Sequence, residues 1–165
     1  MKMTTEEAFV KVLQRHGIRH AFGIIGSAFM PISDLFPKAG IAFWDCAHEG
    51  SGGMMADGYT RACGRMSMMI AQNGPGITNF VTAVKTAYWN HTPLLLVTPQ
   101  AANKTLGQGG FQEVEQMALF RTWSPIRRRC ATRPASPRCS TASSSGRCGR
   151  PLPRRSTCRA ISGPR

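Results

Sequence analysis

Glu49 is the residue of this sequence best placed for acid–base chemistry. It stands between His48 and a run of glycines in "DCAHEGSGG", residues 45–53. An apolar, strand-like stretch (41–44) comes before it, and a helix-like stretch (50–63) comes after it. A carboxylate at such a junction is often a first-turn acid stabilised by the helix dipole. In a poorly solvated cleft it can instead share a proton with a ligand, although the local context alone favours the helix-terminal role.

A second candidate stretch is "NGPGITN", residues 73–79, which follows the apolar run 66–72. Pro75 and Gly76 are residues that set the backbone of a turn, and Asn79 adds a polar side chain just before a predicted helix. The stretch is therefore either an ordinary turn or a loop that lines a ligand. Its position directly after a predicted buried strand makes the loop a candidate for binding.

Two weaker candidates complete the set. Gly26 and Ser27 directly follow the apolar run 18–25, and they fit either a tight strand-to-helix turn or a loop near a reacting centre. Phe111 and Gln112 lie in "GQGGFQEVEQ", residues 107–116. They fit either the start of a helix with an exposed Gln or an element that contacts substrate.

Alternating helices and strands are predicted to position these candidates. Thr4 and Glu7 have the spacing of a capping box, which predicts a helix within 4–17 that Gly17 ends. Short, nearly all-apolar strands separated by helices are typical of a mostly parallel sheet with helices on both faces. We therefore expect a doubly wound α/β domain whose candidate residues converge at the carboxyl ends of the strands. The expected strands are 18–25, 41–44, 66–72 and 93–98, and the expected further helices are 30–40, 50–63 and 80–90.

The chain divides near Phe120 into two parts of different composition. Residues 1–120 hold nine Lys and Arg against eight Asp and Glu, whereas residues 121–165 hold twelve Arg and no acid. The second part is rich in Arg, Ser and Pro, and its only aromatic residue is Trp123. Such a segment cannot bury enough apolar surface to fold. We expect a domain over 1–120 followed by a disordered basic tail over 121–165.

Two explanations account for this tail. A basic segment can bind nucleic acid, but the absence of Lys and the shortage of aromatic side chains for base stacking argue against that. Alternatively, the coding sequence has changed frame. Codons can be chosen for residues 121–133 that encode an acidic, helix-compatible continuation after a shift of one base. We favour a frameshift near residue 120.

Neither a membrane segment nor a metal site is indicated. No charged-then-apolar leader opens the sequence, and no apolar run reaches the ~20 residues that a membrane helix requires. The six cysteines show neither CxxC pairing nor the His spacing of a zinc site. We expect a soluble, cytoplasmic protein with no metal ligands of its own.

In order and spacing, the stretches 47–64, 73–79 and 107–116 resemble the N-terminal, pyrimidine-binding domain of thiamine-diphosphate enzymes of the acetolactate synthase type. The opening "HAFGIIGSAF" (20–29) is similar to the first strand and loop of that family. The resemblance covers about residues 1–120. It implies that Glu49 is catalytic, through a hydrogen bond to N1′ of the aminopyrimidine that promotes loss of the thiazolium C2 proton. It also implies cofactor contacts from Gly26, Glu49, Pro75, Gly76 and Asn79, and substrate contacts from Ser27, Phe111 and Gln112.

Within the family, the likeness is greatest to an acetyltransferase branch. That likeness implies conversion of sulfoacetaldehyde and phosphate to acetyl phosphate and sulfite, by a homo-oligomer without nucleic acid or membrane partners. The alternatives are an acetolactate synthase or other 2-oxoacid decarboxylase, and a non-enzymatic basic protein that binds nucleic acid. The family's Gly-Asp-Gly motif with a downstream Asn, which holds Mg²⁺ and the diphosphate, does not occur in this sequence. The resemblance therefore implies half of a cofactor site, in a chain that is inactive alone.

Overall fold

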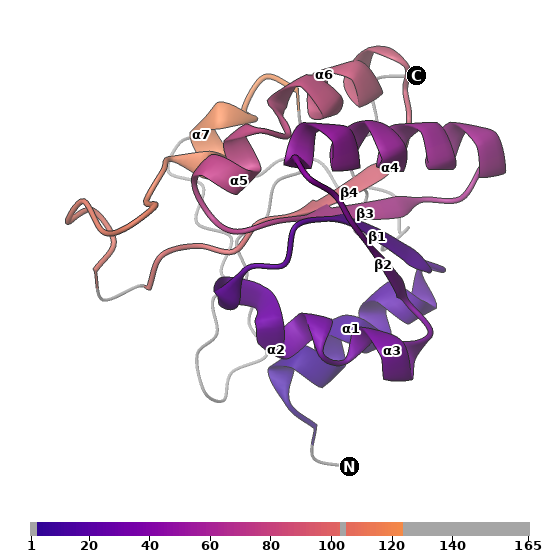
Figure 1. Cartoon of the computed structure of the whole chain (residues 1–165), viewed down its shortest axis with the longest axis horizontal. Coiled ribbons are helices and arrows are strands. Elements are labelled where there is room, and N and C mark those ends of the chain that lie inside the picture. Colours follow the sequence, from indigo (N-terminus) through magenta and orange to yellow (C-terminus); the bar gives the residue numbers. More distant parts are fainter. Residues whose placement is uncertain (1–2, 103–104, 124–165) are drawn as a thin grey trace, which may run out of the picture.

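The computed structural model describes residues 3–102 and 105–123, which form one parallel sheet between two layers of helices (Figure 1). The order of the strands is β2-β1-β3-β4, and every pair of neighbours is parallel. This arrangement confirms the doubly wound α/β fold. The predicted tail beyond Trp123 lies outside the described residues. The strands are β1 (His20–Gly23), β2 (Ala42–Asp45), β3 (Ser67–Ile70) and β4 (Leu94–Val97).

The four strands end at the same edge of the sheet. Gly23, the last residue of β1, pairs with Asp45 of β2 and with Ile70 of β3. Ile70 in turn pairs with Val97, the last residue of β4. The segments that follow the strands therefore start side by side at the carboxyl edge, where ligands bind in open parallel sheets.

Each face of the sheet is covered by its own layer of helices (Figure 1). Side chains alternate between the two layers, as a strand requires. Ala21 and Met68 join the core under one layer, whereas Phe22 and Met69 join the core under the other. The first layer holds α1 (Thr5–Arg15), α2 (Met30–Ser33) and α3 (Phe36–Ala39), and the 3-10 turn η1 (Ser27–Phe29) directly precedes α2. The second layer holds α4 (Glu49–Cys63), α5 (Pro75–Thr78), α6 (Val81–Trp89) and α7 (Gln116–Leu119).

Helix α1 begins and ends as its sequence predicts. The Thr4 hydroxyl accepts from the Glu7 backbone N–H at 3.2 Å, and Glu7 Oε2 accepts from the Thr4 backbone N–H at 2.9 Å. This reciprocal capping box satisfies two of the backbone donors that a helix start leaves free. Gly17, with φ of +73°, follows the helix and turns the chain toward β1.

Three details differ from the expected elements. Residues 30–40 form two one-turn helices instead of one, because Pro37 lacks an amide hydrogen and its ring clashes with the carbonyl four residues earlier. The stretch 73–79 is partly helical, since Pro75 opens the single turn α5. Trp123, three residues past the predicted end of the domain, packs against the core under α4 and α6.

Candidate functional site

The candidate site begins where helix α4 begins, at the carboxyl edge of the sheet. His48 is the N-cap residue, with φ of −151°, and its Nδ1 accepts from the Gly50 backbone N–H at 3.0 Å. Glu49 is therefore the first helical residue and is not needed as the cap. Its carboxylate sits in the first turn, which the helix dipole favours, and is free to bind another partner.

That partner is Asn79, from the segment between β3 and α6. The Asn79 side-chain amide donates to Glu49 Oε2 at 2.8 Å. Glu49 is half-buried. A Cβ atom on Gly76 would lie 3.2 Å from Glu49 Oε1, so the absence of a side chain there leaves this oxygen uncovered. The structure thus brings together three of the predicted cofactor-site residues.

A second group of contacts surrounds Gln72, which sequence reasoning missed. Gln72 Oε1 accepts from the Ala28 backbone N–H at 3.1 Å, and Gln72 Nε2 donates to Gln112 Oε1 at 3.3 Å. A Cβ atom on Gly26 would lie only 2.3 Å from Gln72 Oε1 and 3.0 Å from Gln72 Cα. Gln72 therefore hydrogen-bonds the predicted contact residue Gln112, and the predicted contact residue Gly26 packs closely against it. The available signal was a polar residue two positions after a buried parallel strand.

The backbone of Gln112 is also fixed. Asn73, which is 5% exposed, donates its side-chain amide to the Gln112 carbonyl at 3.0 Å. A Cβ atom on Gly74 would lie 2.2 Å from that carbonyl oxygen, so only glycine allows this approach. Gln112 itself has φ of 57°, in the left-handed region that non-glycine residues seldom adopt. These contacts join residues 72–74 to Gln112 across the carboxyl edge.

The remaining predicted site residues lie outside the two groups of contacts around Glu49 and Gln72. Phe111 is 88% exposed, so its side chain makes little contact with the part of the chain that the structure describes. Ser27 and Pro75 are also exposed, at the first positions of η1 and α5. Their positions are at the same edge, and their roles remain predictions.

Two titratable groups near the edge have pKa values shifted by their surroundings. Backbone N–H groups of Gly107 and Gly110 hydrogen-bond the Glu113 carboxylate and lower its pKa. Burial raises the pKa of the Cys46 thiol, and the nearby Asp45 and Glu49 carboxylates add to that increase. The Cys46 thiol donates to the Gly23 carbonyl at 3.2 Å, so it joins the ends of β1 and β2 and stays protonated.

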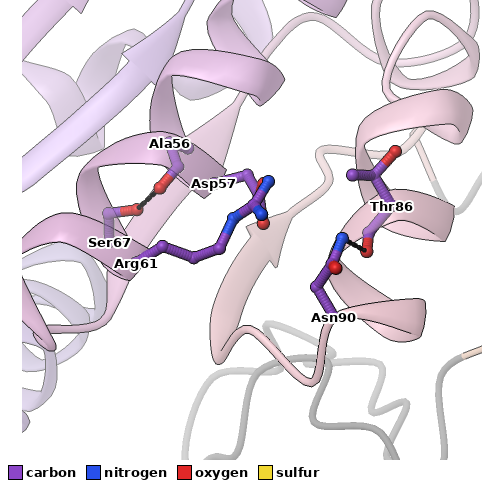
Figure 2. A network of polar contacts seen from close by, with 6 residues as sticks. All are labelled: Ala56, Asp57, Arg61, Ser67, Thr86 and Asn90. Carbon is purple, nitrogen blue, oxygen red and sulfur yellow. Dashed lines mark hydrogen bonds and ion pairs between the residues drawn. The ribbon is translucent and has the colours of Figure 1, made fainter.

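Polar contacts hold the second half of helix α4, both within the helix and to the start of β3 (Figure 2). Asp57 is 1% exposed and forms an ion pair with Arg61 one turn later. The Ser67 hydroxyl at the start of β3 donates to the Ala56 carbonyl at 3.0 Å. A Cβ atom on Gly53 would lie 2.4 Å from Ala83 Cβ, so the glycine allows α4 to pack directly on α6. The contacts of Ala56 and Gly53 hold the helix that begins with Glu49 against β3 and α6.

No cluster of three His, Cys, Asp or Glu side chains that could hold a metal ion occurs within residues 3–102 and 105–123. In the same part of the chain, none of the helices has the length and apolar character to span a membrane. An open surface pocket lies between α2, α3 and β2, and none of the predicted site residues lines it. The candidate site is therefore the exposed carboxyl edge itself.

The edge thus brings a carboxylate at the first turn of α4 against Asn79, three residues after Gly76. Residues 3–119 match the family described as "Thiamine pyrophosphate enzyme, N-terminal TPP binding domain". The chain belongs to this thiamine-diphosphate-dependent enzyme family, and the sequence-based identification is confirmed.

Comparison with individual proteins is more specific than the match to the family. Over 121 residues, the chain is 90% identical to the sulfoacetaldehyde acetyltransferase of Roseovarius nubinhibens and 88% identical to that of Rhodobacter capsulatus. Each alignment covers 73% of this chain and 20% of the relative, so the chain spans about a fifth of their length. Among solved structures, the thiamine diphosphate-dependent 4-hydroxybenzoylformate decarboxylase of Rhodococcus jostii RHA1 has a TM-score of 0.67 at 26% identity. That match covers 72% of this chain and 23% of the other.

Proposed function

We propose that residues 1–120 are the pyrimidine-binding part of a thiamine-diphosphate-dependent acetyltransferase. The reaction of the whole enzyme would convert sulfoacetaldehyde and phosphate to acetyl phosphate and sulfite. The observation that supports the site is the Glu49–Asn79 pair beside Gly76, and the substrate comes from the relatives at 90% and 88% identity. Because the chain spans about a fifth of those relatives, the activity belongs to the longer protein.

The residues at the edge fit an aminopyrimidine ring. The Asn79 amide donates to Glu49 Oε2, whereas Gly76 has no side chain that would cover Glu49 Oε1. The Oε1 atom can therefore accept or share a proton with a ring nitrogen. A flat ring can approach a glycine backbone closely because no Cβ atom intervenes. The cofactor, when bound, supplies the carbanion chemistry, while the protein orients it and tunes its protonation.

Each residue of this chain then has a defined task. Glu49 holds a proton at N1′ of the ring, and Asn79 keeps the carboxylate in the orientation that allows this. The helix start holds Glu49 in place, because His48 supplies the cap. Gly26, Pro75 and Gly76 form the backbone surfaces against the cofactor, while Ser27, Phe111 and Gln112 face the substrate.

The proposal extends to what the rest of the enzyme supplies. The Mg²⁺ and diphosphate site would come from a domain of the whole enzyme outside this sequence, in a cytoplasmic homo-oligomer. This chain alone is therefore expected to be inactive. A frameshift near residue 120 would explain the composition of the tail, and reading the coding DNA across that codon tests it. An intact frame ending at a natural stop, with no open frame beside it, would contradict the frameshift.

A chimera tests the proposed function. Residues 1–120 would replace the corresponding segment of the Roseovarius nubinhibens enzyme, and sulfite release from sulfoacetaldehyde would be assayed with thiamine diphosphate, Mg²⁺ and phosphate. We expect activity in the chimera, and loss of it in the same chimera with Glu49→Gln. Conversion of pyruvate in preference to sulfoacetaldehyde by a frame-restored, full-length enzyme would support the acetolactate synthase alternative. Appreciable sulfite release by the 165-residue chain alone would contradict the half-site proposal.

A further inference from the structure

Gln72 connects the two segments that are proposed to face substrate. Its Oε1 accepts from the Ala28 backbone N–H at 3.1 Å, and its Nε2 donates to Gln112 Oε1 at 3.3 Å. Ala28 lies 44 residues before Gln72, and Gln112 lies 40 residues after it. One side chain therefore holds both segments.

The two hydrogen bonds form a relay from Ala28 through Gln72 to Gln112, and the Ala28 backbone N–H fixes the direction of both. A backbone N–H can only donate, so the oxygen of Gln72 must face Ala28. The nitrogen of Gln72 then faces Gln112, which must present its own oxygen in return. As a result, the amide nitrogen of Gln112 is turned away from Gln72. Amide orientations follow from such networks, and here the starting donor leaves one solution.

Neighbouring residues hold Gln72 and Gln112 in place on both sides. Asn73 holds the Gln112 carbonyl at 3.0 Å, and Gly74 lets that carbonyl approach its Cα closely. On the other side, the Gly26 backbone packs against Gln72 so closely that a Cβ atom would lie 2.3 Å from Gln72 Oε1. Gln112 is therefore held at two of its oxygens, the side-chain Oε1 and the backbone carbonyl.

We propose that Gln72 is a positioning residue that turns the Gln112 amide nitrogen toward the ligand. This part of the site then favours a group whose oxygens only accept hydrogen bonds, such as a sulfonate. The neighbouring Glu113 carboxylate already accepts from the backbone N–H groups of Gly107 and Gly110, so it is less available as an acceptor for the Gln112 amide. The location of the ligand rests on the proposed function, whereas the orientation of the two amides does not.

Charge-matched variants of the 165-residue chain test the proposal. In Gln72→Glu, one carboxylate oxygen still accepts from Ala28, but the other also accepts, so Gln112 must reverse and turn its oxygen outward. In Gln112→Glu, the acceptor for Gln72 stays and the outward donor is lost. Gln100→Glu adds the same charge three residues after β4 ends and serves as the control.

The measurement is the ¹⁵N spectrum of the side-chain amides during titration with ethanesulfonate. We expect ethanesulfonate to shift the Gln112 amide signals of the native chain. Its affinity should fall about tenfold or more in Gln72→Glu and Gln112→Glu, and clearly less in Gln100→Glu. Equal losses in Gln72→Glu and Gln100→Glu, or no response of Gln112 in the native chain, would overturn the proposal. Gln72→Ala should speed hydrogen exchange at the Ala28 amide, whereas Gln72→Glu should not.

Two further readouts separate this proposal from the proposed function. Titration with thiamine tests the site at Glu49 and Asn79. Thiamine binding without ethanesulfonate binding would contradict only the Gln72 proposal. Ethanesulfonate binding without thiamine binding would contradict only the proposed function. In the chimera, Gln72→Glu should raise KM for sulfoacetaldehyde about tenfold with a smaller change in kcat. A fall in kcat with KM unchanged would contradict a role in substrate recognition.

Discussion

The Asn79 side-chain amide donates to Glu49 Oε2 at 2.8 Å, joining the segment before α6 to the first residue of α4 across thirty positions of sequence. Asn79 is exposed, so its replacement should change the stability of the fold very little. It should change the orientation of the carboxylate instead.

We therefore expect Asn79→Ala to weaken thiamine binding about tenfold, the size of a hydrogen bond to a charged group. Isothermal titration of the chain with thiamine measures this. Asn90→Ala is the matched control, because Asn90 donates to the Thr86 carbonyl at 2.9 Å at the far end of α6 (Figure 2). Equal affinities for thiamine in the two variants would show that Asn79 does not orient Glu49.

Two glycines of α4 should respond in opposite directions to the same substitution. A Cβ atom on Gly53 would lie 2.4 Å from Ala83 Cβ and 3.0 Å from Phe80 Cδ1, so Gly53→Ala should cost about 1–3 kcal/mol through overpacking. Nothing lies within 4 Å of a Cβ atom on Gly58, so Gly58→Ala should stabilise the helix by up to about 1 kcal/mol. Urea denaturation of both variants measures the difference. A Gly53→Ala chain as stable as Gly58→Ala would mean that α4 and α6 are not in such close contact.

The Asp57–Arg61 pair predicts an asymmetry between its two partners. Asp57 is 1% exposed, and its Oδ1 has no hydrogen-bond partner among the described residues, whereas the Arg61 side chain is 51% exposed. Arg61→Met leaves a buried carboxylate without its cation, and the expected cost is about 1–3 kcal/mol after allowance for solvent at the arginine. Asp57→Asn removes the buried charge and should cost less.

Chemical denaturation of the two single variants and of the double variant tests this asymmetry. The double variant should be more stable than Arg61→Met alone, because the unpaired charge is gone. If Asp57→Asn proved the more damaging change, the ion pair would not be the dominant interaction of Asp57.

Acid should loosen the turn that precedes Gln112. Hydrogen bonds from Gly107 and Gly110 lower the pKa of Glu113 below its ordinary value of 4.5. A lowered folded-state pKa means that this stabilisation is present above the ordinary value and is lost as pH falls through the lowered one. The amide signals of the two glycines should titrate with a midpoint below 4.5 and lose that response in Glu113→Gln. Glu115→Gln is the control, and a midpoint at or above 4.5 would contradict the arrangement.

The fold was largely predictable because its signals are local. Three of the four strands lie within the apolar runs expected to form them, whereas β2 continues one residue past its run to Asp45. The capping box of Thr4 and Glu7 marked the start of α1. The break between α2 and α3 was missed because one proline in an apolar stretch can open a helix or end one. Whether Pro37 opens a new helix or ends the previous one depends on how residues 30–40 pack on α1, which the sequence does not show.

The candidate site was predictable only in part. Topology places the ends of parallel strands together, so the meeting of Glu49 with residues 73–79 followed from the order of the elements. The relay from the Ala28 backbone N–H through Gln72 to Gln112 joins residues 40 or more positions apart, which no local pattern encodes. His48 was also not expected as a helix cap, because imidazole is not among the usual capping groups.

Helix α4 has a further consequence for engineering this protein. Gly52 and Gly53 let the helix lie against Gly23 and Ala83, and the same helix starts with Glu49. Any substitution that lifts the helix moves the carboxylate by a comparable distance. At the positions of α4 that face the sheet and α6, a screen for thermal tolerance and a screen for ligand affinity would therefore select the same residues, whereas Gly58 lies outside this coupling.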